Sequence, residues 1–569
     1  MLRSGLALFI IFQLSGLSVY AGNPQRAFLE QFESSRMWFP SEDAPILNDS
    51  SGRYPFFLNF LFTNVLSWVP TGEPKVMSPA CLPEVWGERL QDPRVRDQVP
   101  LQGALVQKYF QDCATDLSTG NIGAIVNMTK MMTMKYEPLT HPFLRRVILQ
   151  LPGNIKLKGL LGLKGDMKRR PLVIMRLGIF SNVEDFKPER AWTMMYFDQS
   201  PFNVLLLENM SSGDFIANNS QFSFGGYDEG LQNILVAQML QDSQQPISRI
   251  IDSVHMFGMS LGGNGVLFAS LLNEYNSPKN RPLIQSFLGM CPVVDLQHTM
   301  ESLTQGGTFS ALVDVWSRSR LRGLSDKLSG VNEYDNFSFL KKAVSEIART
   351  YHGGLSYISS VHLPPGMKDS SDFWALNDFW KFYRDVKQPV LILATDKDPA
   401  VPFEVNSGRL QNKSLKVDSK NIRVVNLPEG YHCTLPISYD WKALSTILQS
   451  YVLSHSPGFK LQQKSLVMNL DDEEWTSFAK GAMSARFEVD EPGKSKNFVK
   501  LEVIVTNGEG KEKTLNLSLP LSDFDFRFYN EKLSDAETEM IVRWLNQNLH
   551  LEFTNERNPQ LKISWKVAA

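Results

Sequence analysis

The chain has 569 residues, of which 43% are hydrophobic and 21% charged, and its formal net charge is −2. One hydrophobic core does not serve a chain of this length, so two or three domains are expected. The near-neutral charge excludes the basic surface that is typical of nucleic-acid binding, and we expect no nucleic-acid partner.

The N-terminus has the pattern of a cleaved secretory signal. Arg3 supplies a positive start, and the run from Leu6 to Leu17 is mostly apolar. The small residues Val19 and Ala21 then form a signal-peptidase site. An uncleaved membrane anchor is the alternative, but a bilayer span needs about 20 apolar residues. We therefore expect an exported protein, either periplasmic or secreted.

The segment after the signal is interpreted as an extension, part helical and part irregular, that packs on the main domain. Within it, residues 54–70 carry a polar residue at every fourth position, which predicts an amphipathic helix buried against that domain. Contact with a membrane surface or with substrate is the alternative.

The chain has four cysteines: Cys81, Cys113, Cys291 and Cys433. Export permits disulfides, and the first two share this extension. They are the pair we expect, although sequence does not fix pairing.

From about residue 144, short apolar runs alternate with helical patterns. Strands are predicted at RRVILQL, NIKLKGLLGLKG, PLVIMRLG, NVLLLEN, DSVHMFGMS, PLIQSFLGMCPVV, QPVLILATDKDP and NIRVVNLPEGYHC. Helices are predicted at DEGLQNILVAQMLQD, GVLFASLLNEY and DWKALSTILQSYVLSH. Such alternation indicates βα units and a mostly parallel sheet with helices on both faces. Residues 296–385 are mostly helical and aromatic, which predicts a helical cap inserted into this α/β domain.

The last 110 or so residues have a different sequence pattern. NFVKLEVIVT, the turn NGEG and KEKTLNLSLP predict a β-hairpin. Ser534 precedes Glu537 by three residues, which predicts a capping box that opens a helix, and QLKISWKV predicts a final strand. We interpret this part as a small α+β or β-rich accessory domain. The expected boundaries are 1–21 for the signal, 22–143 for the extension, 144–455 for the main domain and 456–569 for the accessory domain.

The residues Gly258-Met259-Ser260-Leu261-Gly262 match the pattern G-x-S-x-G. The motif follows a predicted strand and opens a predicted helix, as a nucleophile elbow requires. In such a turn the positions two before and two after the serine approach so closely that side chains would clash, which explains Gly258 and Gly262. Ser260 is therefore the candidate nucleophile. A tight turn without chemistry is the alternative.

A serine nucleophile needs a base, and the base needs an orienting acid. Asp396 and Asp398 follow a predicted strand, and we favour Asp398 because it begins the turn that leads to Val401 and Pro402; Asp396 is the alternative. His432 lies in the loop after the next strand, so it is the candidate base. The chain order of serine, acid and histidine is that of an α/β-hydrolase triad.

An oxyanion hole needs two backbone N–H groups. Leu261 should supply one from the start of the elbow helix. The loop after PLVIMRLG should supply the other, from Ile179 or Phe180.

The histidines are scattered, with no HExxH and no CxxC pattern. We therefore expect neither a metal nor a cofactor.

Several motifs carry a resemblance to a known family. GMSLGGN, LATDKDPAVP and GYHC, with DFWKFYRDVKQPVLIL before the acid, resemble the α/β-hydrolase superfamily. SLGGN, KQPVLIL and FSFGGYDEGLQNIL are similar to its YheT-like esterase branch. The resemblance spans roughly residues 144–455. It implies a serine hydrolase of carboxylic esters without a cofactor, with Ser260, Asp398 and His432 as its triad. The family usually has His-Gly after its oxyanion strand, whereas this chain has Arg-Leu-Gly there, which leaves the second donor open.

Three functions stay open at this level. The first is an exported serine esterase or lipase acting on an ester with an apolar acyl group. Four cap aromatics would then cover the acyl pocket or, alternatively, form only the core of the cap: Trp316, Phe373, Trp374 and Trp380. The second is a serine peptidase, because fold and triad do not determine the substrate. The third is a non-catalytic binding protein, against which the complete triad argues. The accessory domain is expected to contact a protein partner, a membrane surface or a large substrate. The alternative is that it only covers apolar surface of the main domain.

Overall fold

The structure, a computed structural model, describes residues 38–40 and 77–568 apart from several internal segments. Those segments are 135, 139–140, 184–186, 280, 307, 322–338, 351–360, 369, 371, 412–419, 471–472, 479–483, 491–497, 522–523, 525–532 and 555–558. The expected signal at 1–21 and the expected helix at 54–70 lie outside the described residues.

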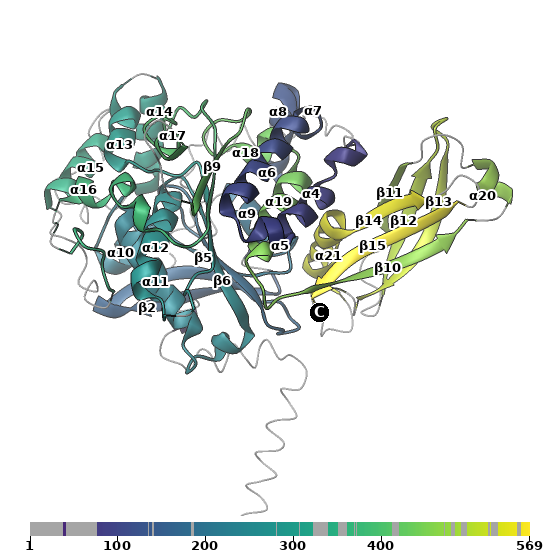
Figure 1. Ribbon diagram of the computed structural model, residues 1–569, viewed down its shortest axis with the longest axis horizontal. Helices are drawn as coiled ribbons and strands as arrows, with labels where there is room; N and C mark the ends of the chain where they lie inside the picture. The colour runs from purple at the N-terminus through teal and green to yellow at the C-terminus, as the bar shows by residue number, and fades with distance from the viewer. Residues whose placement is uncertain are drawn as a thin grey trace, which may run out of the picture.

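A nine-stranded sheet forms the centre of the described chain (Figure 1). Its spatial order is β1 (Trp38–Pro40), β2 (Leu144–Leu151), β3 (Ile155–Gly162), β5 (Asn203–Leu207), β4 (Arg170–Arg176), β6 (Ile251–Met259), β7 (Ser286–Met290), β8 (Val390–Ala394) and β9 (Ile422–Asn426). The six strands from β5 to β9 in this order are parallel, and β1 to β3 add an antiparallel edge. The parallel strands are buried on both faces, which explains their continuous apolar runs.

Helices cover both faces of this sheet. On one face lie α11 (Gly226–Gln241) and α12 (Leu261–Asn276), which pack against each other and on residues such as Ile392 of β8. On the other face lie α9 (Lys187–Tyr196) and α19 (Trp441–Ser454), which pack on the alternate residues such as Leu391. Successive side chains of a strand point to opposite faces, so β8 contributes to both cores. The expected mostly parallel sheet is confirmed.

Apart from strand β1, the N-terminal extension is mainly helical where it is described. It contains α4 (Pro83–Gln91), α5 (Pro93–Arg96), α6 (Val99–Asp112), α7 (Ala114–Leu117) and α8 (Gly120–Thr133). The disulfide between Cys81 and Cys113 is present, as expected. Helix α4 packs on α19, α6 packs on β9, and α8 packs on α9 and α18 (Leu435–Ser438). The extension therefore completes one helical layer of the main domain.

The cap lies beside the C-terminal ends of the parallel strands. It contains α13 (Leu296–Thr304), α14 (Thr308–Leu321), α15 (Phe339–Thr350) and α16 (Phe373–Leu376). Its apolar side chains form a third core cluster together with Phe180, Leu261 and Val401 of the main domain. Two short helices of the main domain, α10 (Gly213–Asn219) and α17 (Ser407–Gln411), pack on β3 and β9. None of the helices within the described residues is both long and apolar enough to cross a membrane.

The C-terminal part is built on two small antiparallel sheets. One is β10 (Leu461–Asn469), β15 (Gln560–Ala568) and β14 (His550–Thr554), and the other is β11 (Ser484–Asp490), β12 (Phe498–Thr506) and β13 (Glu512–Pro520). Two helices accompany them, α20 (Glu473–Phe478) and α21 (Asp535–Asn548). The expected hairpin is β12–β13, and the expected capping box of Ser534 and Glu537 opens α21. Both expectations are confirmed, whereas β10, β11 and β14 were not predicted. The strands extend away from the main domain in Figure 1, and α21 lies between them and it.

Candidate active site

Ser260 lies in a sharp turn between β6 and α12. Its φ is 56° and its ψ −121°, a backbone conformation that costs a non-glycine residue about 1–3 kcal/mol. A Cβ on Gly258 would lie 2.5 Å from the carbonyl oxygen of Gly262, and a Cβ on Gly262 would lie 2.3 Å from that of Leu177. The steric reason expected for these two glycines is therefore present. The strained turn presents the Ser260 hydroxyl at the C-terminal edge of the sheet.

His432 lies between Ser260 and Asp398. Its Nδ1 is 2.8 Å from Asp398 Oδ2, and its Nε2 is 2.9 Å from Ser260 Oγ. A carboxylate only accepts hydrogen bonds, so Nδ1 of a neutral His432 donates to Asp398 and Nε2 accepts from the serine hydroxyl. This is the arrangement that a general base for a serine nucleophile requires.

The structure distinguishes the two candidate acids. Asp398 is 7% exposed, and its Oδ1 accepts hydrogen bonds from the N–H groups of Ala400 and Val401 at 2.8 and 2.9 Å. These bonds orient the carboxylate toward His432. Asp396 is exposed and makes no hydrogen bond to His432. Of the two, Asp398 alone has the geometry of the orienting acid.

The three side chains come from three of the parallel strands. Ser260 follows β6, Asp398 lies in the turn after β8, and His432 lies in the loop after β9. Ligands of open α/β sheets bind at the carboxyl ends of the strands. Because the strands are buried and paired, they fix the starting point of each of these loops.

The two expected sources of oxyanion donors differ in outcome. No acceptor for the N–H of Leu261 or of Ile179 is found among the described residues. The N–H of Phe180, in contrast, donates to Ser211 Oγ at 2.8 Å. The expectation for Phe180 is therefore wrong in this conformation, because its donor is already used. Gly178 places the loop beside the serine, since a Cβ on it would be 3.7 Å from Ser260 Cβ.

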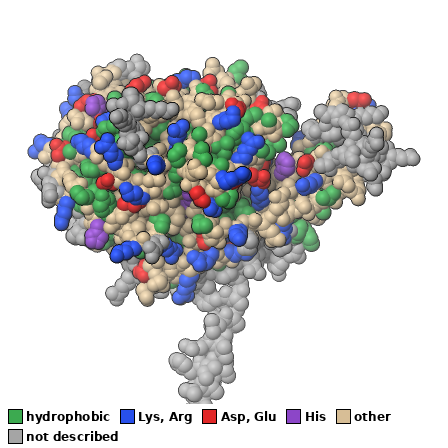
Figure 2. Space-filling view, in the orientation of Figure 1, with side chains coloured by type: hydrophobic (Ala, Val, Ile, Leu, Met, Phe, Trp, Pro, Cys, Tyr) green, Lys and Arg blue, Asp and Glu red, His purple; other side chains and the backbone are tan. Residues whose placement is uncertain are grey.

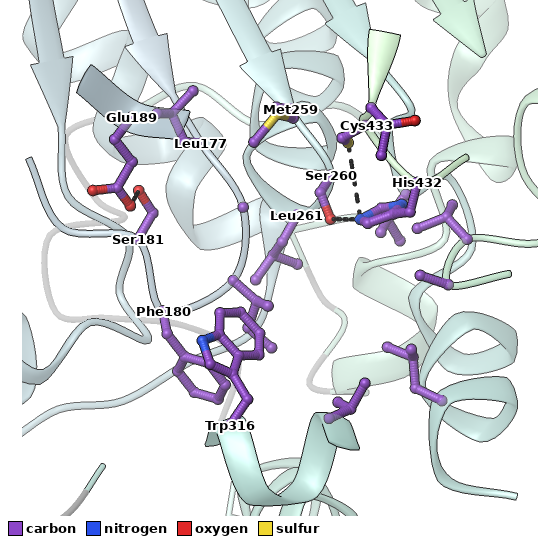
Figure 3. A pocket seen from close by; sticks show the side chains of 18 of the residues that line it. Leu177, Phe180, Ser181, Glu189, Met259, Ser260, Leu261, Trp316, His432 and Cys433 are labelled. Atoms are coloured by element: carbon purple, nitrogen blue, oxygen red, sulfur yellow. Dashed lines mark hydrogen bonds between the residues drawn. The ribbon is translucent and has the colours of Figure 1, made fainter. Parts of the chain in front are cut away.

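A cavity of about 480 Å³ reaches Ser260 (Figure 3). It is lined mainly by apolar side chains from the loop after β4, the cap, the loop of His432 and helix α8. The residues from α8 are Met128, Met131 and Met132, and the residues from the cap are Thr299, Met300, Leu303, Val313, Trp316, Arg320 and Leu340. The N-terminal extension therefore forms part of the wall next to the nucleophile.

The cavity has one buried polar wall. Ser181 Oγ donates to Glu189 Oε1 at 2.6 Å, and both side chains are buried. In Figure 3 they lie on the opposite side of Ser260 from His432. Arg320 Nη2 donates to the carbonyl oxygen of Phe180 at 2.9 Å, which connects the cap to the oxyanion loop.

The four aromatic side chains expected over the acyl pocket lie in different places. Trp316 lines the cavity, and its ring lies 5.3 Å from that of Phe180. Phe373 and Trp374 belong to the core cluster of the cap. Trp380 stacks on Tyr383 against the main core, with the Arg409 guanidinium over its ring. Of the four, only Trp316 fits the expectation of an aromatic over an acyl pocket, and Trp380 does not, because it packs against the core of the main domain.

The sequence left the pairing of Cys291 and Cys433 open, and the structure joins them in a disulfide. Cys433 directly follows His432 and lines the cavity. The two sulfurs and the imidazole lie as close together as the ligands of a metal site. The sulfurs are bonded to each other, however, so they are not available as thiolate ligands.

Two contributions to this site were missed in the sequence. One is the disulfide beside His432, which only spatial proximity reveals. The other is the methionine wall, for which a signal existed. Met128, Met131 and Met132 are spaced i, i+3 and i+4, so they share one face of a helix. A Met-rich helical face is typical of an adaptable apolar binding surface.

No protein-family model matches the sequence, and neither does any curated protein. Among solved structures, the chain is similar to a 2,6-dihydroxy-pseudo-oxynicotine hydrolase, with 14% identity, a TM-score of 0.36 and coverage of 65% of this chain and 86% of that one. It is similar to an esterase of Pyrococcus furiosus, with 13% identity, a TM-score of 0.35 and coverage of 55% and 92%. It is also similar to dipeptidyl peptidase 4 of Porphyromonas gingivalis, with 11% identity and a TM-score of 0.30, covering 54% of this chain and 34% of that one.

The fold class follows from the topology of this chain itself. A mostly parallel sheet with helices on both faces carries a serine elbow after β6, an aspartate turn after β8 and a histidine loop after β9. This combination defines an α/β-hydrolase fold. The similarity to the YheT-like branch stays a prediction.

Proposed function

We propose that this protein is a serine hydrolase that cleaves carboxylic esters with an apolar acyl group. The observation that carries the proposal is the pair of hydrogen bonds by which His432 joins Ser260 to Asp398. A non-catalytic binding protein has no need for a strained serine, an oriented imidazole and a buried carboxylate in one line.

The geometry supports a reaction through an acyl-enzyme. Ser260 Oγ attacks the acyl carbonyl carbon while its proton passes to His432 Nε2. Asp398 stabilises the resulting imidazolium, and we assign the N–H groups of Leu261 and Ile179 as the donors to the developing oxyanion. The tetrahedral adduct collapses, and the leaving alkoxide takes the proton from His432. Water then attacks the acyl-enzyme with His432 as base, which releases the carboxylic acid and restores Ser260.

The cavity supports an apolar acyl group rather than a peptide. Its walls are methionine, leucine, valine, isoleucine and tryptophan side chains over most of their extent. Burying a peptide group without hydrogen bonds costs about 1–3 kcal/mol by mutational measurement, whereas each buried methylene of an acyl chain gains about 0.8 kcal/mol. An acyl chain therefore fits this lining better than a polypeptide does.

The experiment compares p-nitrophenyl esters with peptide p-nitroanilides, using the wild-type protein and Ser260→Ala. We expect ester hydrolysis that disappears in Ser260→Ala and no hydrolysis of the anilides. Hydrolysis of anilides at a rate equal to that of esters supports the peptidase alternative. Hydrolysis of neither class, by a folded protein, contradicts the enzymatic proposal.

We also propose that the protein is exported. The signal pattern that ends near Ala21 supports this, and so does the presence of all four cysteines in disulfides, which persist in oxidising compartments. Detection of the mature N-terminus near residue 22 in an exported fraction tests the proposal. An uncleaved N-terminus in the cytoplasm contradicts it.

A further inference from the structure

The Cys291–Cys433 disulfide lies where the three elements of the triad meet. Cys291 directly follows β7, and the preceding residue, Met290, accepts the N–H of Ser260 at 3.0 Å through its carbonyl oxygen. The N–H of Cys291 donates to the carbonyl oxygen of Leu393 on β8 at 2.7 Å, close to the turn of Asp398. The disulfide then connects Cys291 to the residue after His432. One strand end is thus tied to the nucleophile, to the acid strand and to the base loop.

Apart from the disulfide, the contacts given for the loop that carries His432 are not covalent. It runs from the end of β9 to α18, and Tyr431 at its tip is 62% exposed. Its hydrogen bonds include Glu429 N–H to Tyr439 Oη at 2.9 Å, Lys397 Nζ to the Pro428 carbonyl oxygen at 2.7 Å and Tyr431 N–H to Thr434 Oγ1 at 2.7 Å. Each such bond contributes about 0.5–1.5 kcal/mol, and exposed loops open easily. The disulfide is the covalent connection of this loop to the sheet.

The sulfur atoms also face the catalytic nitrogen. Cys433 Sγ lies 3.8 Å from His432 Nε2, the atom that accepts from Ser260 Oγ (Figure 3). A disulfide sulfur has no proton to donate. The free thiol of a reduced Cys433 would be a donor, and beside an imidazole it would tend to form a thiolate–imidazolium pair. The disulfide therefore leaves Nε2 facing the serine hydroxyl alone.

Both cysteines adopt left-handed backbone conformations, with φ of 43° at Cys291 and 52° at Cys433. Such values are uncommon for residues other than glycine and persist where the surrounding structure holds them. Two of them at the ends of one bridge, next to the elbow, indicate that the bridge holds a specific conformation of the base loop.

We propose that the Cys291–Cys433 disulfide is a positioning element of the active site, which holds His432 at hydrogen-bonding distance from Ser260 and keeps a competing thiol away from its Nε2. This inference rests on the proposed serine hydrolase function. Its consequence is an enzyme that is active with the bridge formed and impaired when the bridge is reduced. A displacement of about 1 Å in an active site costs up to about 10²-fold in rate.

The chain offers a matched control, because its other disulfide, Cys81–Cys113, lies in the extension. The test compares Cys291→Ala/Cys433→Ala with Cys81→Ala/Cys113→Ala. Both are assayed for ester hydrolysis, for the rate of fluorophosphonate labelling of Ser260 and for thermal unfolding. We expect kcat and the labelling rate to fall at least tenfold in the first variant, with KM within about twofold of the wild-type value, because every wall residue of the cavity other than Cys433 is unchanged. The second variant should keep both rates near wild type while losing thermal stability.

A second measurement works even when the first variant does not fold. In Cys81→Ala/Cys113→Ala the chain has only Cys291 and Cys433 left, so a dithiol such as dithiothreitol reduces a single disulfide. One dithiol converts the bridge to two thiols and becomes a cyclic disulfide. Split aliquots give ester hydrolysis and, after alkylation, the number of free thiols. Activity should fall as two thiols appear, with unchanged circular dichroism, and should return on reoxidation.

Full activity with both thiols free overturns the positioning role and leaves the serine hydrolase proposal intact. The same holds for a folded Cys291→Ala/Cys433→Ala variant with wild-type kcat and labelling rate. A wild-type protein that neither labels nor hydrolyses esters instead overturns the function on which this inference rests.

Discussion

Arg543, on helix α21 of the C-terminal part, donates from Nε to Oδ2 of the fully buried Asp198 at 2.7 Å. The other carboxylate oxygen, Oδ1, lies 2.9 Å from His141 Nε2 of the extension. Burial alone would raise the pKa of Asp198, but its interactions with His141, Arg543 and Lys164 outweigh burial and hold that pKa below its usual value. One carboxylate thus connects the extension, the main domain and the C-terminal part.

We predict that Arg543→Met lowers the free energy of unfolding by about 3–5 kcal/mol, because it leaves a buried charge without one of its partners. Denaturant unfolding measures this loss. Arg486→Met is the control, since it removes an exposed ion pair with Glu512 whose contribution is at most about 1 kcal/mol. Equal losses in the two variants would show that Asp198 needs no partner from α21.

The contact between Arg543 and Asp198 bears on the expectation that the C-terminal part is an accessory domain. The side chains of α21 belong to the same core cluster as those of α9 and α19, and Asn548 Nδ2 donates to the Gln199 carbonyl oxygen. A truncation near Ser456 would therefore expose apolar surface of the main domain as well as Asp198. The accessory role of residues 456–569 stays a prediction, and it is best tested by substitutions on β11–β13, away from this contact.

Asp398→Asn should lower kcat on the order of 10⁴-fold, because an amide does not stabilise the imidazolium and favours the wrong tautomer of His432. Asp396→Asn, an exposed neighbour two residues away, is the matched control and should stay within about twofold of wild type. Steady-state kinetics with one p-nitrophenyl ester decides between them. The reverse ranking would transfer the role of the acid to Asp396.

The methionines of α8 should set the acyl length that the cavity accepts. Met131→Trp and Met132→Trp reduce the space beside Ser260, so kcat/KM for a long-chain ester should fall at least about tenfold relative to a two-carbon acyl ester. A series of p-nitrophenyl esters of increasing chain length measures this ratio. Lys130→Trp adds the same bulk at an exposed position of the same helix and should leave the ratio unchanged. An unchanged ratio in the cavity variants would remove α8 from the acyl site.

The buried His255 should make the folded state less stable as the pH falls. It is fully buried among the hydroxyls of Ser253, Ser286 and Ser456. Burial, followed by repulsion from His455, lowers its pKa to about 3. The unfolded chain takes up this proton near pH 6.5, so below that pH the unfolded state binds more protons than the folded state. Stability is then lost as pH falls from about 6.5 toward 3, by up to about 1.4 kcal/mol per pH unit.

Urea unfolding at pH 7 and pH 5 tests this sign. The wild-type protein should lose about 2 kcal/mol more than His255→Gln over that interval, because the variant lacks the titrating group. His362→Gln changes an exposed histidine and is the control. A variant at position 255 with the same pH response as the wild type contradicts the assignment.

Local sequence patterns predicted the strands of the sheet and the serine turn, but not the parts of the site that depend on residues far apart in the chain. Continuous apolar runs marked β4 to β9, and the glycines around Ser260 marked the elbow, because both depend on residues near each other in the chain. The donor of the oxyanion loop did not follow from sequence, since the N–H of Phe180 is used by Ser211, 31 residues away. The Cys291–Cys433 bridge spans 142 residues and arises only because parallel strands bring their ends together. Strand β10 was missed because it pairs with β15, the last strand of the chain, which is far from it in sequence.

The charge distribution agrees with the near-neutral composition. On the face drawn in Figure 2, the described lysine, arginine, aspartate and glutamate side chains are interspersed rather than gathered by sign. Such a surface gives no electrostatic attraction for a polyanion. The absence of a nucleic-acid partner stays a prediction, and a binding assay at low salt tests it directly.

The central claim is that Ser260 is a nucleophile activated by His432. The most direct test is to incubate the folded protein with a fluorophosphonate and to locate the adduct by peptide mass spectrometry. We predict one phosphonylated residue, Ser260, with labelling that disappears in Ser260→Ala and slows by several orders of magnitude in His432→Ala. An unlabelled wild-type protein, or an adduct on another serine, would contradict this account of the site.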